Sequence, residues 1–289
     1  METIRVIPSG YCKGVVGAIN IAKKARADYP DARIYVLGMI VHNSYVTNQL
    51  AKADIITLDD SVKSKEELLD EIQEGVVIFT AHGIADHIVE KAQKKGLITI
   101  NASCVDVLKT RDIIKKHLQE GFDILYFGKK HHPEAEAILA LSPNIHLLSK
   151  KADVLDLKIA NPKLFLTNQT TMSMLELKEL IELIKERYPH VIIQEEICNA
   201  TSSRQQAIID LQDCELLYVV GDTKSNNTTR LKEIAIKQGI KNVHLISCAA
   251  EIKKDDLKGH QKVHVTAGAS TPPELIQEVI DFLRAETPQ

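Results

Sequence analysis

Short apolar runs alternate along the chain with longer segments in which apolar residues recur every three or four positions. The runs are rich in β-branched residues and predict strands at 33–38, 76–80, 97–100, 123–127, 164–167, 191–194, 216–220 and 263–266. The periodic segments predict helices at 63–74, 86–95, 105–120, 174–188, 229–238 and 273–285. Strands that are apolar throughout and alternate with helices are typical of parallel sheets covered on both faces. The pattern therefore predicts an α/β protein.

Three cysteines divide this pattern into nearly equal parts. Cys12 and Cys104 are 92 residues apart, and Cys104 and Cys198 are 94 residues apart. Each cysteine follows a predicted strand and opens a helical segment, with residues 3–7 forming the strand before Cys12. Cys214 and Cys248 fall outside this frame, and we interpret them as core residues.

Two polar clusters follow each cysteine at matched distances. The first cluster comes 27 to 30 residues later and reads His42-Asn43, His131-His132-Pro133-Glu134 and Ser225-Asn226-Asn227 in the three repeats. The second comes 66 to 72 residues later and reads Ala81-His82-Gly83, Gln169-Thr170-Thr171 and Gly268-Ala269-Ser270. Every cluster lies where a predicted strand ends. The agreement predicts three α/β units related by a pseudo-threefold axis.

The repeat also predicts the unit boundaries. A chain of 289 residues would ordinarily suggest two domains, but the spacing favours units at 13–103, 104–197 and 198–289. The last unit ends in a helix and lacks a closing strand, so we expect residues 1–12 to join its sheet and close the ring. Ligands of parallel sheets bind beyond the carboxyl ends of the strands. We therefore expect the cysteines and polar clusters to surround a central cavity.

Three symmetric cysteines suit an iron–sulfur cluster. They can hold three irons of a four-iron cluster, which usually has four cysteine ligands, and leave the fourth iron open as a Lewis acid. Three other interpretations stay open at this point. They are a non-catalytic iron–sulfur sensor or scaffold, a zinc enzyme, and a metal-free protein that binds an anionic metabolite.

The polar clusters suit a phosphate or diphosphate group. They combine imidazoles, hydroxyls and amides with the starts of helices, and His42, His82 and His132 each lie just past a strand. Glu134 is the only carboxylate in the six clusters, and beside Thr170 and His132 it can deliver a proton to a departing hydroxyl. The alternative is that Glu134 serves only as a favourable charge at the start of a helix after Pro133.

Charge, composition and the lengths of apolar runs limit the classes of binding partner and the location that we expect. The net charge is −3, no basic stripe is present and aromatic residues make up 4% of the chain, so we expect no nucleic-acid partner. The N-terminal segment lacks the pattern of a secretory signal, and no apolar run approaches the roughly 18 residues of a membrane span. We therefore expect a cytoplasmic protein without membrane contact, in which the five cysteines stay reduced.

Several motifs together resemble one known family. In chain order they are GYCKGV, VHNSYV, TAHG, HPE, NQTTMS, CNATSSRQ, SNNTTRL and TAGASTP. The sequence is similar over nearly its whole length to the LytB/IspH family of 4-hydroxy-3-methylbut-2-enyl diphosphate reductases, which act in the non-mevalonate pathway of isoprenoid biosynthesis.

The resemblance implies a role for each group. It implies a 4Fe–4S cluster on Cys12, Cys104 and Cys198, and Glu134 as proton donor with His132 and Thr170 beside the substrate hydroxyl. It implies substrate binding by His42, His82, His132, Thr170, Ser225, Asn226, Asn227 and Ser270. The implied reaction takes two electrons from ferredoxin or flavodoxin, removes the hydroxyl of an allylic diphosphate as water, and forms isopentenyl and dimethylallyl diphosphates.

The chain departs from the family pattern at a few positions. Asn101 and Val105 flank Cys104 where the family usually has Asp and Pro, Asn226 replaces a serine, and Ala137 replaces a glycine. Every implied ligand and the implied acid are nevertheless present, so the expected reaction class is unchanged.

Overall fold

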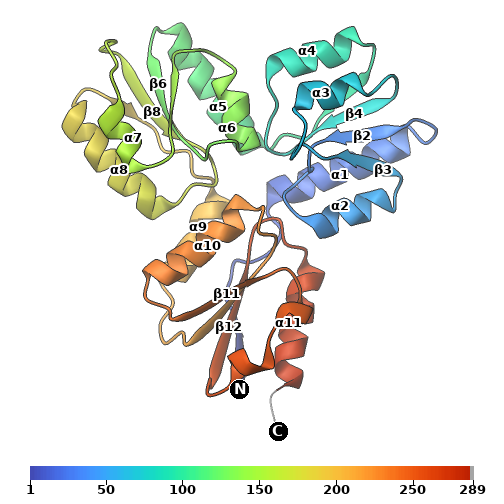
Figure 1. The fold of residues 1–289 in the computed structure, drawn as a ribbon, viewed down its shortest axis with the longest axis vertical. Coiled ribbons are helices and arrows are strands. Elements are labelled where there is room, and N and C mark those ends of the chain that lie inside the picture. The colour runs from blue at the N-terminus through green and yellow to red at the C-terminus, as the bar shows by residue number, and fades with distance from the viewer. Residues whose placement is uncertain (287–289) are drawn as a thin grey trace. The chain divides into compact units, whose positions relative to one another are not determined.

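The computed structural model describes residues 1–286 and contains three four-stranded parallel sheets with helices between the strands (Figure 1). The predicted α/β class is confirmed. The pseudo-threefold arrangement around a cavity and the unit boundaries stay predictions.

The three sheets repeat one strand order. The first sheet is β3-β2-β4-β5, the second is β7-β6-β8-β9, and the third is β11-β10-β12-β1. The first strand of each repeat lies second from one edge of its sheet; these strands are β2, β6 and β10. The strand that precedes a cysteine lies at the other edge; these strands are β5, β9 and β1. The N-terminal strand β1 (Glu2–Arg5) pairs with β12, with Glu2 opposite Lys262, and so takes the place that β5 and β9 have in the other sheets.

The elements of the first repeat are β2 (Ile34–Leu37), β3 (Ile55–Leu58), β4 (Val76–Phe79) and β5 (Ile98–Asn101), with α1 (Lys13–Asp28), α2 (Ser44–Ala51), α3 (Lys65–Asp70) and α4 (Asp86–Lys94). Those of the second are β6 (Asp123–Phe127), β7 (Ile145–Leu148), β8 (Leu164–Asn168) and β9 (Ile192–Ile193), with α5 (Val105–Gln119), α6 (Pro133–Leu139), α7 (Lys151–Asp156) and α8 (Met174–Arg187). The third has β10 (Leu216–Val220), β11 (Asn242–Ile246) and β12 (Lys262–Ala267), with α9 (Asn199–Ile209), α10 (Asn226–Lys237), two 3₁₀ turns (Ala249–Glu251 and Lys254–Leu257) and α11 (Pro273–Ala285).

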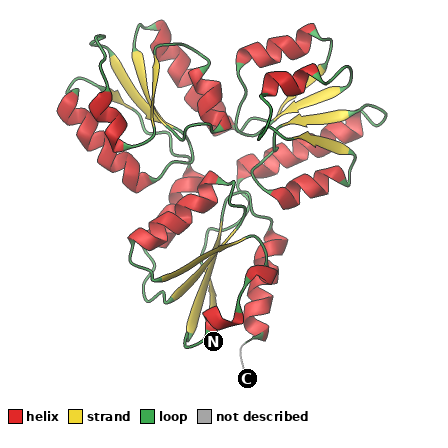
Figure 2. Cartoon of the chain, in the orientation of Figure 1, coloured by secondary structure: helices red, strands yellow, loops and turns green. Residues whose placement is uncertain are grey.

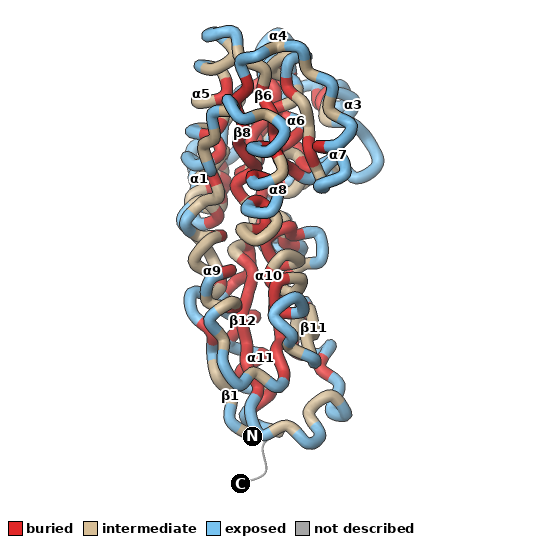
Figure 3. Tube along the Cα trace, turned by 90° about the vertical axis from the view of Figure 1, so that its left-hand side faces the viewer, coloured by how far each residue is buried: buried red, intermediate tan, exposed pale blue. Residues whose placement is uncertain are grey.

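Helices cover both faces of each sheet (Figure 2). Strand β6 shows how its sequence produces this arrangement. Because successive side chains of a strand point to opposite faces, Ile124 and Tyr126 pack in the core beneath α5 and α6, whereas Leu125 and Phe127 pack beneath α7 and α8. All four side chains are almost fully buried, and burial of each stabilises the fold by about 1.5–3 kcal/mol. Figure 3 shows that strands are largely buried, whereas the helices outside them are more exposed.

The described chain separates into two compact units. The smaller unit comprises residues 1–15, 42–46 and the part from Asn199 onward, and it contains the third sheet. The larger unit comprises residues 16–41 and 47–198, and it contains the first and second sheets. Within residues 1–286, no helix combines the length and apolar character needed to cross a membrane.

Candidate functional site

The three cysteines of the repeat are held by the same backbone hydrogen bond. In each case the cysteine N–H donates to a carbonyl in the second polar cluster of a repeat. The N–O distances are 3.1 Å for Cys12 to Ala269, 2.9 Å for Cys104 to Ala81 and 3.1 Å for Cys198 to Thr170. The repeat read from residue spacing is therefore also a repeat of main-chain geometry at the cysteine positions.

The cysteine side chains lie at strand-to-helix junctions and are half-buried. Cys104 is the residue just before the first turn of α5, and its Sγ lies 4.0 Å from the carboxylate of Asp106 in that turn. Burial, with the nearby charge of Glu215, raises the pKa of Cys214 to about 11, so this side chain stays a neutral thiol at physiological pH. Cys248 precedes the first 3₁₀ turn and is half-buried.

Two predicted histidines meet in the larger unit. The rings of His82 and His132 have centroids 5.5 Å apart and meet edge to face. His132 also caps α6, because its Nδ1 accepts the N–H of Glu134 at 3.2 Å. A nitrogen that accepts a hydrogen bond carries no proton, so in the neutral imidazole the proton lies on Nε2. In its neutral form His132 is therefore a hydrogen-bond donor at Nε2.

Glu134 is buried beside Thr170. The residue is only 2% exposed to solvent. Its Oε1 accepts the N–H of Thr170 at 2.8 Å, and its Oε2 lies 2.9 Å from the Thr170 hydroxyl. The Tyr126 hydroxyl lies 3.5 Å from Oε1. Burial raises the pKa of Glu134 to about 7, against the opposing hydrogen bonds from Thr170 and Tyr126 and with a contribution from the charge of Asp106. Glu134 can therefore hold and release a proton near neutral pH.

The loop that carries His82 lies close to two helices of the second repeat. Gly83 has a φ of +88°, and a Cβ there would lie 3.2 Å from Val107 on α5 and 3.8 Å from Ala137 on α6. The glycine therefore permits both the turn and the close approach.

The smaller unit brings together a second group of predicted residues. The Ser270 hydroxyl donates to the carbonyl of His42 at 3.0 Å, and the Ser225 hydroxyl accepts the N–H of Thr228 and caps α10. Asn227 accepts the N–H of Ala269 at 3.1 Å and donates to the hydroxyl of Thr201 at 3.0 Å. Asn227 therefore holds Ala269, the residue whose carbonyl accepts the Cys12 N–H. Asn226 is buried in the first turn of α10.

Three further residues lie beside these groups and were not singled out in the sequence. Tyr126 and Asp106 influence Glu134, as described above. Asp222 accepts the N–H of Ser44 at 3.0 Å and its hydroxyl at 2.6 Å, and so fixes the segment after His42. Although burial alone would raise the pKa of Asp222, the hydrogen bonds from Ser44 and Lys224 hold it below its usual value.

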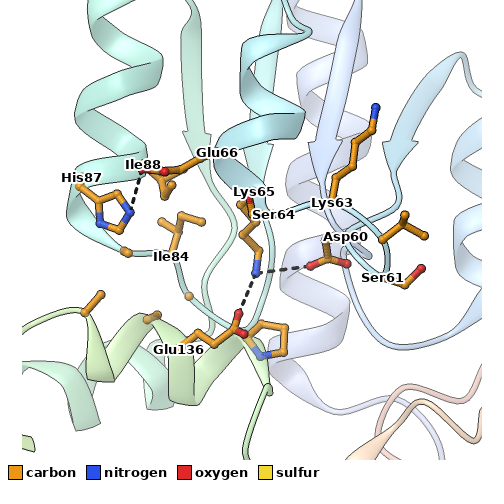
Figure 4. Close-up of a pocket in the computed structure, with 16 residues that line it drawn as sticks. Asp60, Ser61, Lys63, Ser64, Lys65, Glu66, Ile84, His87, Ile88 and Glu136 are labelled. Atoms are coloured by element: carbon orange, nitrogen blue, oxygen red, sulfur yellow. Dashed lines mark ion pairs between the residues drawn. The ribbon is translucent and has the colours of Figure 1, made fainter.

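A separate cleft of about 480 Å³ lies in the larger unit, between α3, α4 and α6 (Figure 4). Its lining includes Gly83 and Pro133, the chain neighbours of His82 and His132. Lys65 crosses the cleft, with its ammonium 3.4 Å from Asp60 and 4.0 Å from Glu136 on α6. The cleft contains none of the side chains predicted to bind substrate or cluster.

The family model described as "LytB protein" matches residues 4–284. The chain belongs to the LytB family. It is 44% identical to 4-hydroxy-3-methylbut-2-enyl diphosphate reductase from Lysinibacillus sphaericus over 98% of this chain and 88% of that protein. Identity to the enzyme of the same name from Bacillus subtilis is also 44%, over 98% and 90% of the two chains.

Solved structures agree with this family membership. The E-1-hydroxy-2-methyl-but-2-enyl-4-diphosphate reductase from Plasmodium falciparum superimposes with a TM-score of 0.90 at 30% identity, over 98% of this chain and 87% of that chain. A structure described as (E)-4-hydroxy-3-methyl-but-2-enyl diphosphate reductase, the terminal enzyme of the non-mevalonate pathway, matches with a TM-score of 0.68 at 27% identity, over 99% and 100% of the two chains. The resemblance inferred from the motifs is confirmed at the level of the family.

Proposed function

We propose that the chain is a 4-hydroxy-3-methylbut-2-enyl diphosphate reductase. The reaction consumes two electrons and two protons, removes the allylic hydroxyl as water, and yields isopentenyl and dimethylallyl diphosphates. One observation carries the proposal: the N–H of each of the three equivalent cysteines donates the same kind of backbone hydrogen bond. The chain is also 44% identical to an enzyme of that name. Packing alone does not require cysteine at one equivalent place in each repeat.

The cysteines Cys12, Cys104 and Cys198 would hold a 4Fe–4S cluster. Their thiolates are the soft ligands that such clusters use, and all three are half-buried rather than enclosed in the core. When bound, the cluster supplies the electrons and an iron without a protein ligand that acts as a Lewis acid.

The polar residues would bind the diphosphate group. His42, His82 and His132, with Ser225, Asn226, Asn227 and Ser270, supply the donors that phosphate oxygens need. The Nε2–H of His132 is fixed by the bond that its Nδ1 accepts from α6. The cap therefore orients one donor before substrate arrives.

Glu134 would deliver the proton that turns the departing hydroxyl into water. Thr170 holds both carboxyl oxygens of Glu134 and is itself a hydroxyl donor beside them. A pKa of about 7 keeps a large fraction of Glu134 protonated at neutral pH, while its burial excludes water that would compete for the proton. Thr170 therefore positions the acid, and Glu134 supplies the proton.

Anaerobic purification followed by a turnover assay tests this function. We expect a brown protein with close to four irons and four sulfides per chain that converts the diphosphate alcohol to the two products when a chemical reductant is supplied. A zinc enzyme or a metal-free binding protein would lack iron and sulfide. A non-catalytic iron–sulfur protein would contain the cluster and give no product. A ferredoxin or flavodoxin donor and a cytoplasmic location stay predictions from the sequence.

A further inference from the structure

In the larger unit, a lysine on the helix that begins after Cys104 forms an ion pair with a glutamate just before Cys198. Lys109 lies on α5, five residues after Cys104. Its ammonium lies 3.2 Å from Oε1 and 3.0 Å from Oε2 of Glu196, two residues before Cys198. The helix that opens at one cysteine is therefore bonded to the segment that leads to the next.

Glu196 is the centre of a small hydrogen-bonded network. The residue is 7% exposed, its carboxylate accepts the side-chain amide of Gln194 at 2.7 Å, and its N–H donates to the side chain of Asn168 at 3.0 Å. Asn168 is itself fully buried at the end of β8. Loss of the lysine would leave a buried carboxylate without its countercharge, which is a costly arrangement.

An equivalent link occurs within the smaller unit. Arg204 lies on α9, six residues after Cys198. Its Nη2 donates to the carbonyl of Gly10 at 2.5 Å, two residues before Cys12, while its Nη1 donates to Ala200 in its own helix at 2.6 Å. In the remaining repeat the corresponding positions after Cys12 are Gly17 and Ala18, whose side chains are absent or a single methyl group.

We infer that Lys109 and Arg204 are positioning residues, which hold the Cys198 and Cys12 segments in place for cluster binding. The inference rests on the proposed function, because it assumes that these cysteines hold the cluster. Each segment is fixed at the cysteine N–H by the repeated backbone bond, and the basic side chain fixes it again two residues earlier. Two attachments leave the cysteine little freedom, so the ligand position is set before metal binds. Residues that support metal ligands in this way typically change metal affinity by about 10- to 100-fold when they are replaced.

The rate of iron release measures this role directly. The cluster-loaded variants Lys109→Met and Glu196→Gln are incubated anaerobically with a ferrous-iron chelator, and we expect iron release about tenfold faster than in the wild type. Lys109→Arg keeps the charge and should stay within about twofold of the wild-type rate. The control is Lys115→Met, since Lys115 lies on the same helix and its ammonium pairs with Asp86 at 3.1 Å, outside the network. Wild-type release rates in Lys109→Met and Glu196→Gln would overturn the inference.

A second measurement separates positioning from general stability. We expect Lys109→Met to change the midpoint potential of the cluster in an EPR-monitored redox titration, whereas Lys115→Met leaves it unchanged. Equal potentials in the wild type and Lys109→Met would count against the inference. Arg204→Lys tests the other link by the same chelator assay, after circular dichroism has shown that it folds; if it does not fold, the Lys109 variants decide. A wild-type protein purified anaerobically without iron and sulfide would instead refute the proposed function.

Discussion

Two opposing effects act on Glu134, and the larger one sets its chemistry. The hydrogen bonds from Thr170 favour the ionised carboxylate, each typically by about 1.5–3 kcal/mol. Removal of the carboxyl group from water favours the neutral acid, and the pKa of about 7 shows that burial prevails. The neighbouring Tyr126 hydroxyl does not compete as an acid, because burial raises its pKa well above 10.

Replacement of Glu134 by glutamine should separate catalysis from binding. Glutamine keeps the shape and much of the bonding to Thr170, but it cannot supply the proton. General acid catalysis contributes about a hundred- to ten-thousandfold, so steady-state turnover with a chemical reductant should fall by that factor while iron content and substrate affinity stay close to wild type. If Glu134 were only a favourable helix charge, the change would cost stability of less than about 1 kcal/mol. Turnover within a fewfold of wild type would remove Glu134 as the acid.

The pKa of Glu134 also predicts a pH dependence of stability. The group has a pKa of about 7 in the folded protein and an ordinary value of 4.5, so the folded state binds the proton more tightly. Its contribution to stability is fully present below about pH 4.5 and is lost as pH rises through about 7. The loss is on the order of 3 kcal/mol. Urea midpoints of the wild type and Glu134→Gln at pH 6 and pH 8 check this. We expect the urea midpoint of the wild type to fall more than that of the variant between pH 6 and pH 8. Equal changes of the midpoint in the two proteins would contradict the prediction.

At the scale of elements, the recurring unit is a strand, a turn that bears a cysteine, and a helix. Its backbone bond is the same in all three copies, although the residues that accept it are alanine twice and threonine once. Because a main-chain carbonyl accepts the bond, the geometry does not depend on which side chain stands there. This explains how three cysteines keep equivalent positions while the sequences around them differ.

Replacement of single cysteines by serine tests which cysteines bind the cluster. Cys12→Ser, Cys104→Ser and Cys198→Ser should each abolish stable cluster binding, because each removes one of three protein ligands. Cys214→Ser and Cys248→Ser should retain it. Iron and sulfide analysis of the five variants, purified anaerobically, provides the comparison. An intact cluster in Cys104→Ser would refute the proposed ligand set.

The sequence pattern predicts the central strands and longer helices well, and it misses one edge strand in each sheet. Strand β10 and helix α11 have the predicted bounds. Strands β3, β7 and β11 are not predicted, because they are only partly buried and, as in Asn242–Ile246, can mix polar with apolar residues. Helices α2, α6 and α7 have eight residues or fewer, too few for a clear helical period.

The same limit applies to the candidate site. Spacing predicts residues that recur in each repeat, such as the cysteines. It does not reveal contacts whose residue types differ from one repeat to the next. The bond from Lys109 to Glu196 spans 87 residues and that from Arg204 to Gly10 spans 194, and no periodic signal marks either pair. The pKa of Glu134 likewise depends on burial that only the folded chain provides.

At the scale of the whole molecule, the third sheet is built from both ends of the chain. Strand β1 pairs with β12 along residues 2–5, and Met1 packs against the core formed beneath α11. The loop that carries Cys12 continues directly from this strand. The position of Cys12 therefore depends on residues more than 250 positions later in the sequence.

Replacement of residues 2–5 by Gly-Ser-Gly-Ser tests this dependence without changing chain length. Glycine and serine fit a strand poorly, so we expect a lower urea midpoint and a large loss of bound iron. A matched replacement of residues 55–58, which form the edge strand β3 in the larger unit, should also lower the midpoint but leave the Cys12 loop attached to Ala269. Full iron content after the N-terminal replacement would contradict the prediction.

The pairing of β1 with β12 also sets an order of events during protein synthesis. The Ala269 carbonyl, which accepts the Cys12 N–H, is synthesised more than 250 residues after Cys12. The second repeat, which carries its own strands β6 to β9, can fold while synthesis continues, since domains generally fold as units from the N-terminal side. The segment of Cys12 must wait until β12 has been made. A cluster that needs all three cysteines in place can therefore be inserted only after β12 and Ala269 have been synthesised.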